Sequence, residues 1–142
     1  MTQNQSHLLS DNELDQVVER LLALTHTKKI FTFTGTLGAG KTTLIQALCK
    51  TLGVTEPVQS PTYTYMNIYK TPETTIYHFD LYRLSSYHDF VEAGFEEYLS
   101  IPNSFCFIEW PEVVQSTLPV NDTCSIFIDY HEKKRLYTLS YS

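Results

Sequence analysis

The spacing of hydrophobic residues changes along the chain and divides its first half into three segments. Residues 12–25 place leucines and valines three and four positions apart, which predicts an amphipathic helix. Residues 28–35 are rich in β-branched and aromatic residues and predict a short strand. Residues 41–53 return to helical spacing and end at Gly53, a residue type that favours helix C-termini. The chain before these segments is polar, and we expect it to be a loose start.

Strand-like patterns dominate the middle of the chain. Residues 63–69 and 75–82 both read as strands, and the Lys-Thr-Pro-Glu turn between them predicts a hairpin. Residues 87–100 predict one or two short helices that break near Gly94. Residues 104–110 form a continuous apolar run, which is typical of a strand covered on both faces.

The last third predicts a short helix and a second hairpin. Residues 111–119 open on Pro111, which suits the first turn of a helix. Residues 123–130 and 135–142 alternate as strands and flank a basic run at 131–135. The whole order mixes parallel crossover units with antiparallel pairs, so we predict an α/β fold with three layers and a mixed parallel and antiparallel sheet.

Length and composition fit one domain that spans residues 1–142. No apolar run approaches the roughly 18 residues needed to cross a bilayer, and the polar N-terminus lacks signal-peptide features, so we expect a cytoplasmic location. Three cysteines stand far apart in apolar segments, which predicts buried free thiols. The formal net charge of −6 argues against a protein that grips nucleic acid directly. The basic run at 131–135 is more typical of a solvated hairpin turn.

A glycine-rich segment at residues 35–42, Gly-Thr-Leu-Gly-Ala-Gly-Lys-Thr, matches the phosphate-binding pattern G-x-x-x-x-G-K-[ST]. It lies between a predicted strand and a predicted helix, which is the context that such a loop requires. Glycines let the backbone wrap around an anion, and the start of the helix adds a positive field. We expect Lys41 to reach the β- and γ-phosphates and the Thr42 hydroxyl to bind Mg²⁺. The segment therefore predicts a nucleotide phosphate site.

Such a loop needs an acidic residue at the end of a neighbouring strand to hold hydrated Mg²⁺. Asp80 and Glu109 are the two candidates, because each ends a predicted strand. Glu109 follows the better buried run, and Asp80 follows a hairpin strand that we expect to be more exposed. Which acid contacts the metal directly stays open. Ser60 and Thr62 lie on the loop where switch proteins sense a γ-phosphate, although an ordinary turn fits equally well.

The chain shows no Asn/Thr-Lys-x-Asp stretch of the kind that reads guanine, which favours ATP over GTP. It also shows no arginine-rich lid of the kind a small-molecule kinase uses to exclude water. No arginine stands out as a finger supplied by the same chain. We therefore expect hydrolysis to be weak in isolation and to be stimulated by a partner.

Four blocks, GTLGAGKTTL, QSPTYTY, YHFDLYRL and FIEWPE, occur here in the order and approximate spacing of the TsaE family, also called YjeE. The resemblance covers residues 29–111. TsaE is a small bacterial P-loop ATPase required for the threonylcarbamoyl modification of adenosine 37 in tRNA. The resemblance implies that the chain uses ATP and Mg²⁺, binds the TsaB–TsaD heterodimer, and meets tRNA only through these partners, with no role at a membrane.

The resemblance also assigns site residues. Asp80 resembles the family's Walker-B-like acid, and Glu109 its second acid at Mg²⁺; with Lys41 they are the implied catalytic residues. Thr42 is the implied hydroxyl ligand of the metal, and Thr62 resembles the switch residue near the γ-phosphate and metal. The implied ATP-binding residues are Gly38, Ala39, Gly40, Lys41, Thr42, Thr43 and Trp110.

One departure concerns the adenine. The family's first helix often opens with a threonine near the base, and Leu14 stands at that place here. Backbone near Asp11 and Asn12 is the expected adenine contact instead. Tyr82 and Arg83 share the block of Asp80 and could serve either partner docking or packing.

Three functions stay open at this point. The first is a partner-dependent ATPase of the TsaE type, in which water attacks the γ-phosphate in line. The second is a small-molecule kinase built on the same phosphate loop. The third is an adaptor that binds ATP without meaningful turnover.

Overall fold

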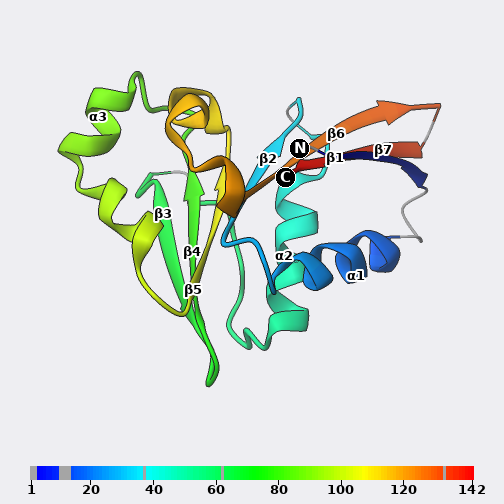
Figure 1. The fold of residues 1–142 in the computed structure, drawn as a ribbon, viewed down its shortest axis with the longest axis horizontal. Helices are drawn as coiled ribbons and strands as arrows, with labels where there is room; N and C mark the ends of the chain where they lie inside the picture. The colour runs from blue at the N-terminus through cyan, green and yellow to red at the C-terminus, as the bar shows by residue number, and fades with distance from the viewer. Residues whose placement is uncertain (1–2, 10–13, 37, 62, 133) are drawn as a thin grey trace.

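The structure is a computed structural model that describes residues 3–9, 14–36, 38–61, 63–132 and 134–142. Within them the strands form one seven-stranded sheet in the order β1-β7-β6-β2-β5-β4-β3 (Figure 1). The strands are β1 (Gln3–Leu9), β2 (Ile30–Thr34), β3 (Met66–Lys70), β4 (Thr75–Asp80), β5 (Ser104–Glu109), β6 (Thr123–His131) and β7 (Lys134–Tyr141). The helices are α1 (Leu14–Leu24), α2 (Lys41–Leu52) and α3 (Tyr87–Glu92), and the 3₁₀ turns are η2 (Phe95–Ser100), η3 (Pro111–Val113), η4 (Gln115–Thr117) and η5 (Val120–Asp122).

Parallel strands occupy the centre of the sheet. β2 runs parallel to β5 on one side and to β6 on the other, and β4 runs parallel to β5. The pairs β3–β4, β6–β7 and β1–β7 are antiparallel. The predicted mixed sheet is therefore confirmed. The carboxyl ends of β2, β4 and β5 meet at one edge, which is where α/β sheets bind ligands.

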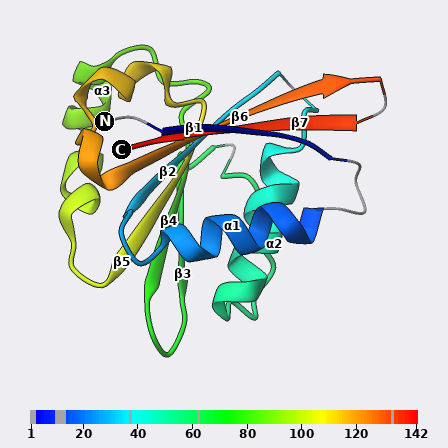
Figure 2. The same ribbon diagram turned by 45° about the vertical axis from the view of Figure 1, so that its right-hand side comes forward.

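Helices cover both faces of the sheet, as the predicted three layers require (Figures 1 and 2). α1 and α2 share one apolar core with Phe31 and Phe33 of β2. Ile30, one position earlier in the same strand, belongs to a second core with Phe90 of α3. Successive side chains of β2 point to opposite sides, and the strand is buried on both faces because both sides are covered. Among the described residues no helix is both long and apolar enough to cross a membrane.

Three details differ from the sequence prediction. The polar start of the chain forms β1, an edge strand whose backbone pairs with β7 from Gln3↔Tyr141 to Leu9↔Arg135. Backbone pairing of this kind leaves no hydrophobic period to detect. Residues 111–119 form two short 3₁₀ turns, η3 and η4, in place of the predicted helix. β4 is also not exposed: it lies between β5 and β3, and Ile76 and Phe79 are fully buried.

The three cysteines are free and buried, as predicted. Burial raises the pKa of Cys49, Cys106 and Cys124 to about 12. The thiolate is the reactive form, so these groups stay protonated and unreactive near neutral pH.

We therefore expect Ellman's reagent at pH 8 to modify none of the three thiols in the folded protein and all of them in guanidinium chloride. The absorbance of the released thiolate measures both states. Rapid stoichiometric labelling without denaturant would contradict the burial of these side chains.

Candidate nucleotide site

The glycine-rich loop connects β2 to α2 at the carboxyl edge of the sheet. Its glycines Gly38 and Gly40 have φ angles of 79° and 103°, in the left-handed region that other residues resist. Gly40 caps α2 without a side-chain hydrogen bond, so the first amides of the helix face the loop without a competing side chain. This arrangement can hold an anion such as a phosphate.

Lys41 is the first residue of α2, and its side chain folds over the loop. The Nζ atom donates to the carbonyl oxygens of Gly35 at 2.5 Å and Thr36 at 3.0 Å. It also lies 4.1 Å from the centre of the Trp110 ring. Burial lowers the pKa of the ammonium, and the carboxylates of Glu109 and Asp80 partly oppose this effect. Lys41 is thus a buried cation held at the mouth of the loop.

Thr42, Glu109 and His78 form a continuous chain of contacts beside Lys41. The Thr42 hydroxyl donates to Oε1 of Glu109 at 3.0 Å, and Nε2 of His78 lies 2.7 Å from Oε2. Glu109 is only 2% exposed, and His78 is fully buried. Nδ1 of His78 has no hydrogen-bond partner among the described residues. The tautomer with hydrogen on Nε2 therefore fits best, because it donates to the carboxylate and leaves only an acceptor unpaired.

Asp80 lies next to Glu109, since the two residues pair in the register of β4 and β5. Its Oδ2 accepts from the Ser60 hydroxyl at 2.6 Å, and its Oδ1 accepts from the backbone amide of Tyr82 at 3.0 Å. The carboxylate is half-buried. Ser60 thereby joins the loop before β3 to the acidic side of the site.

Trp110 follows directly after β5 and has φ 55° and ψ 61°, a left-handed conformation that is unusual for a bulky residue. Its ring lies 4.7 Å from the ring of Tyr82, measured between centroids. This conformation turns the indole back over Lys41 instead of letting it continue the direction of the strand.

These groups surround one pocket of about 290 Å³. Most of the residues predicted from the sequence therefore come together. Ala39 differs, because its side chain is buried in the core and only its backbone is close to the loop. Asp11, Asn12 and Thr62 lie outside the described residues. The residues that line the pocket are Gly38, Gly40, Lys41, Thr42, Thr43, Ser60, Asp80, Glu109, Trp110 and Arg135.

Sequence reasoning missed two residues of this site. The sequence predicts Arg135 at the end of the basic turn and the start of a strand, but not at this site. It is the second residue of β7, and its Nε donates to the carbonyl oxygen of Ala39 at 2.8 Å. The turn itself is confirmed between β6 and β7. His78 carried a signal, since it precedes Asp80 by two positions and so points to the same face of the strand. No local pattern marks Arg135.

The protein alone offers oxygen ligands suited to a hard cation, namely the Thr42 hydroxyl and the carboxylates of Glu109 and Asp80. Among the described residues, no group of three or more His, Cys, Asp or Glu side chains could hold a metal ion by itself. This donor set fits Mg²⁺, which is commonly bound by one or two carboxylates together with substrate phosphates.

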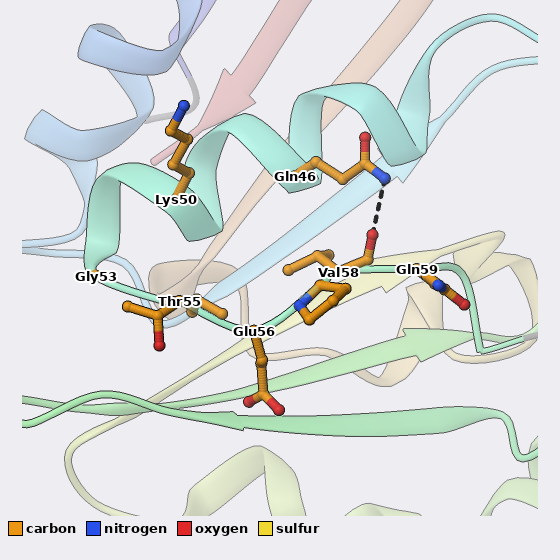
Figure 3. A pocket seen from close by; sticks show the side chains of 9 residues that line it. Gln46, Lys50, Gly53, Thr55, Glu56, Val58 and Gln59 are labelled. Atoms are coloured by element: carbon orange, nitrogen blue, oxygen red, sulfur yellow. Dashed lines mark hydrogen bonds between the residues drawn. The ribbon is translucent and has the colours of Figure 1, made fainter.

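A larger groove of about 760 Å³ lies elsewhere, between α2 and the loop at residues 53–59. Gln46 crosses it and donates to the carbonyl oxygen of Val58 at 2.8 Å (Figure 3). The Lys50 and Glu56 side chains point away from each other in this view. The groove therefore lacks the converging charged groups that mark the smaller pocket.

Comparison with known proteins gives a consistent result. The family model described as "Threonylcarbamoyl adenosine biosynthesis protein TsaE" matches residues 8–137. The tRNA threonylcarbamoyladenosine biosynthesis protein TsaE of Haemophilus influenzae is 41% identical over 118 residues, which covers 82% of this chain and 73% of that protein. The protein of the same name from Rickettsia bellii is 37% identical over 120 residues, covering 84% and 82%. The crystal structure of Bacillus subtilis YdiB superposes with a TM-score of 0.76 at 25% identity, covering 99% of this chain and 87% of that one.

Proposed function

This chain belongs to the TsaE family, and we propose that it binds and hydrolyses ATP with Mg²⁺ to support threonylcarbamoyladenosine formation at position 37 of tRNA. The observation that carries the proposal is the convergence of Lys41, Thr42, Asp80 and Glu109 on one pocket at a glycine-rich loop. Each supplies a part that phosphoryl transfer to water requires: a cation, a metal ligand and acids.

The contacts suggest separate roles for the residues. On binding of ATP, the Lys41 ammonium leaves the carbonyl oxygens of Gly35 and Thr36 for the phosphate oxygens. Thr42 and Glu109 already touch, and together they would hold Mg²⁺, whose positive charge would stabilise the phosphates. Asp80 lies one strand further from the loop, and we assign it to orienting water.

We further propose that the chain acts with TsaB and TsaD in the cytoplasm and contacts tRNA only through them. The net charge of −6 supports this part of the proposal, because direct grip on a phosphate backbone favours a basic surface. The exposed Tyr82 side chain, which packs against Trp110 beside the pocket, is of the kind that protein interfaces favour.

Phosphate release from ATP, measured with and without added TsaB–TsaD, tests the proposal. We expect a slow basal rate and a higher rate with the partners. Transfer of phosphate to a metabolite without partners would instead establish a kinase. Tight ATP binding with no release under either condition would establish a non-hydrolysing adaptor.

A further prediction concerns His78, whose Nε2 occupies one oxygen of Glu109 and leaves the other for Thr42 and the metal. We expect His78→Leu to lower turnover and raise the Mg²⁺ concentration needed for half-maximal rate, each by about 10- to 100-fold, as seen when partners of metal ligands are removed. Steady-state phosphate release over a range of Mg²⁺ concentrations measures both effects.

Two comparison variants make this result interpretable. His78→Gln keeps an N–H donor near the same point and should recover most of the Mg²⁺ dependence. His88→Leu removes an exposed histidine of α3 and should behave as wild type. If the glutamine variant were as impaired as the leucine variant, the bond to Glu109 would not be the reason.

A further inference from the structure

Ser60 brings the loop that connects α2 to β3 into contact with the acidic side of the pocket. Its hydroxyl donates to Oδ2 of Asp80 at 2.6 Å, and the backbone amide of Tyr82 donates to Oδ1 at 3.0 Å. Hydrogen bonds to a carboxylate are roughly twice as strong as those between neutral groups. Each carboxylate oxygen of Asp80 therefore has a donor, and together the two donors fix the plane of the group. Because the Tyr82 donor is a backbone amide, Ser60 supplies the side-chain part of this arrangement.

Two side chains of β3 hold the residue that precedes Ser60. The backbone amide of Gln59 donates to the Tyr69 hydroxyl at 3.3 Å, and its carbonyl oxygen accepts from the same hydroxyl at 3.3 Å and from Nδ2 of Asn67 at 3.1 Å. Tyr69 is buried, and burial raises its pKa, so the hydroxyl keeps its hydrogen near neutral pH. The backbone of Gln59 is thus held at both its donor and its acceptor.

A third side chain ties the loop to the helix of the phosphate site. Nε2 of Gln46 donates to the carbonyl oxygen of Val58 at 2.8 Å (Figure 3). Gln46 lies four residues after Thr42 on α2, so the two side chains occupy the same face of the helix. We call Gln46, Asn67 and Tyr69 the loop clamp, because all three hold the backbone just before Ser60.

The backbone after Ser60 is held as well. The amide of Tyr65 donates to the carbonyl oxygen of Pro61 at 3.2 Å, and the carbonyl oxygen of Tyr65 accepts from the amide of Asp80 at 2.9 Å. Pro61 itself is buried and has a fixed φ angle. Ser60 is therefore anchored from both sides by groups of the protein, which lowers the entropy cost of keeping its hydroxyl on Asp80.

Resting on the proposed function, we propose that Ser60 is a positioning residue that fixes the Asp80 carboxylate in the orientation that aligns the attacking water. The loop clamp holds Ser60 in place for this task. Without the hydroxyl, Asp80 keeps its charge but spends less time in the productive orientation. A misplacement of about 1 Å is enough to cost about 100-fold in rate. Ser60 acts through Asp80, so nucleotide affinity does not depend on its hydroxyl.

Steady-state phosphate release with TsaB–TsaD present, together with calorimetric titration with ADP, tests this assignment in wild type, Ser60→Ala and Ser60→Thr. We expect Ser60→Ala to lower kcat by about 10- to 100-fold and to leave KM and ADP affinity within about twofold of wild type. Ser60→Thr keeps the hydroxyl and should recover most of kcat. An equal loss of ADP affinity would mean that Ser60 shapes the nucleotide site and would overturn the assignment.

A double-mutant cycle separates positioning from a direct role in the reaction. Asp80→Ala removes the group through which Ser60 acts, so adding Ser60→Ala to it should lower kcat by no more than about twofold further. If the two losses multiplied, the Ser60 hydroxyl would contact the water or the phosphate itself, and the assignment would be wrong.

Tyr69→Phe tests the loop clamp, because it removes one hydroxyl and leaves Ser60 and Asp80 unaltered. We expect kcat to fall by about fivefold, the effect of one hydrogen bond, with ADP affinity unchanged. This variant carries the test if thermal unfolding shows that Ser60→Ala is not folded. Wild-type kcat in Tyr69→Phe would refute the role of the clamp.

Thr55→Ala is the matched control, since it removes an exposed hydroxyl from the same loop and should behave as wild type. Unchanged kcat in Ser60→Ala, with wild type hydrolysing ATP, would refute this inference alone. Absence of hydrolysis in wild type with the partners present would refute the proposed function as well.

Discussion

Lys41→Ala is expected to reduce ATP hydrolysis at least about 100-fold. Losses of this size follow when an enzyme loses one group that stabilises charge in the transition state. The ammonium is a buried cation that lines the pocket. The backbone amides of the loop would contact the same phosphate oxygens as Lys41. Without it, negative charge that develops on the γ-phosphate loses its compact counter-charge. Single-turnover phosphate release with saturating ATP measures the effect apart from binding.

Lys50→Ala is the matched control, since Lys50 lies on the same helix α2 and its side chain is exposed. We expect its turnover to remain within about twofold of wild type, as for most exposed substitutions. Full activity of Lys41→Ala, with a normal melting temperature, would remove the phosphate-loop interpretation altogether.

Glu109→Gln should abolish most of the Mg²⁺ dependence of ATP binding and lower hydrolysis by about 100-fold or more, because it removes the negative ligand while nearly keeping its shape. Glutamine can accept from Thr42 and donate to Nε2 of His78 once that ring carries its hydrogen on Nδ1, so the packing around the pocket is retained. Isothermal titration of ATP with Mg²⁺ and with EDTA separates the loss of metal binding from loss of nucleotide binding. The two titrations should nearly coincide in the variant and differ in wild type.

Glu109→Ala is a less informative change. It leaves the fully buried His78 without the partner of its Nε2 atom, which costs about 1–3 kcal/mol of folding free energy. Glu97→Gln, on the exposed turn η2, controls for the loss of one acidic charge. If Glu109→Gln kept the wild-type difference between Mg²⁺ and EDTA, Asp80 rather than Glu109 would be the principal metal ligand.

The phosphate loop and both acids could be predicted because their chemistry is local. In the loop, glycines that adopt left-handed angles stand close to Lys41, the lysine that begins α2. A buried strand that ends in an acid is visible as a continuous apolar run followed by that acid. The sequence did not predict that Asp80 pairs with Glu109, and it underestimated the burial of β4. One edge of β4 pairs with β3, its partner in the predicted hairpin. The sequence of a hairpin alone does not show that the other edge of β4 pairs with β5.

Arg135 and β1 could not be predicted for a shared reason. Both depend on β7, which returns to the sheet beyond β6 and carries Arg135 to a loop 96 positions away in sequence. The acceptor of the Arg135 hydrogen bond is a backbone carbonyl oxygen, which every residue has. The sequence around Ala39 therefore cannot indicate that an arginine binds there. β1 is likewise held by backbone pairing, which a polar sequence satisfies as well as an apolar one.

The turned-back conformation of Trp110 has a practical consequence for all of these measurements. It is the only tryptophan in the chain, and its indole lies against the Lys41 ammonium. Indole emission responds to the polarity and charge around the ring, so the fluorescence of the unlabelled protein reports on the nucleotide pocket itself. The molecule thus carries a built-in optical probe at the position where its proposed ligand would move a positive charge.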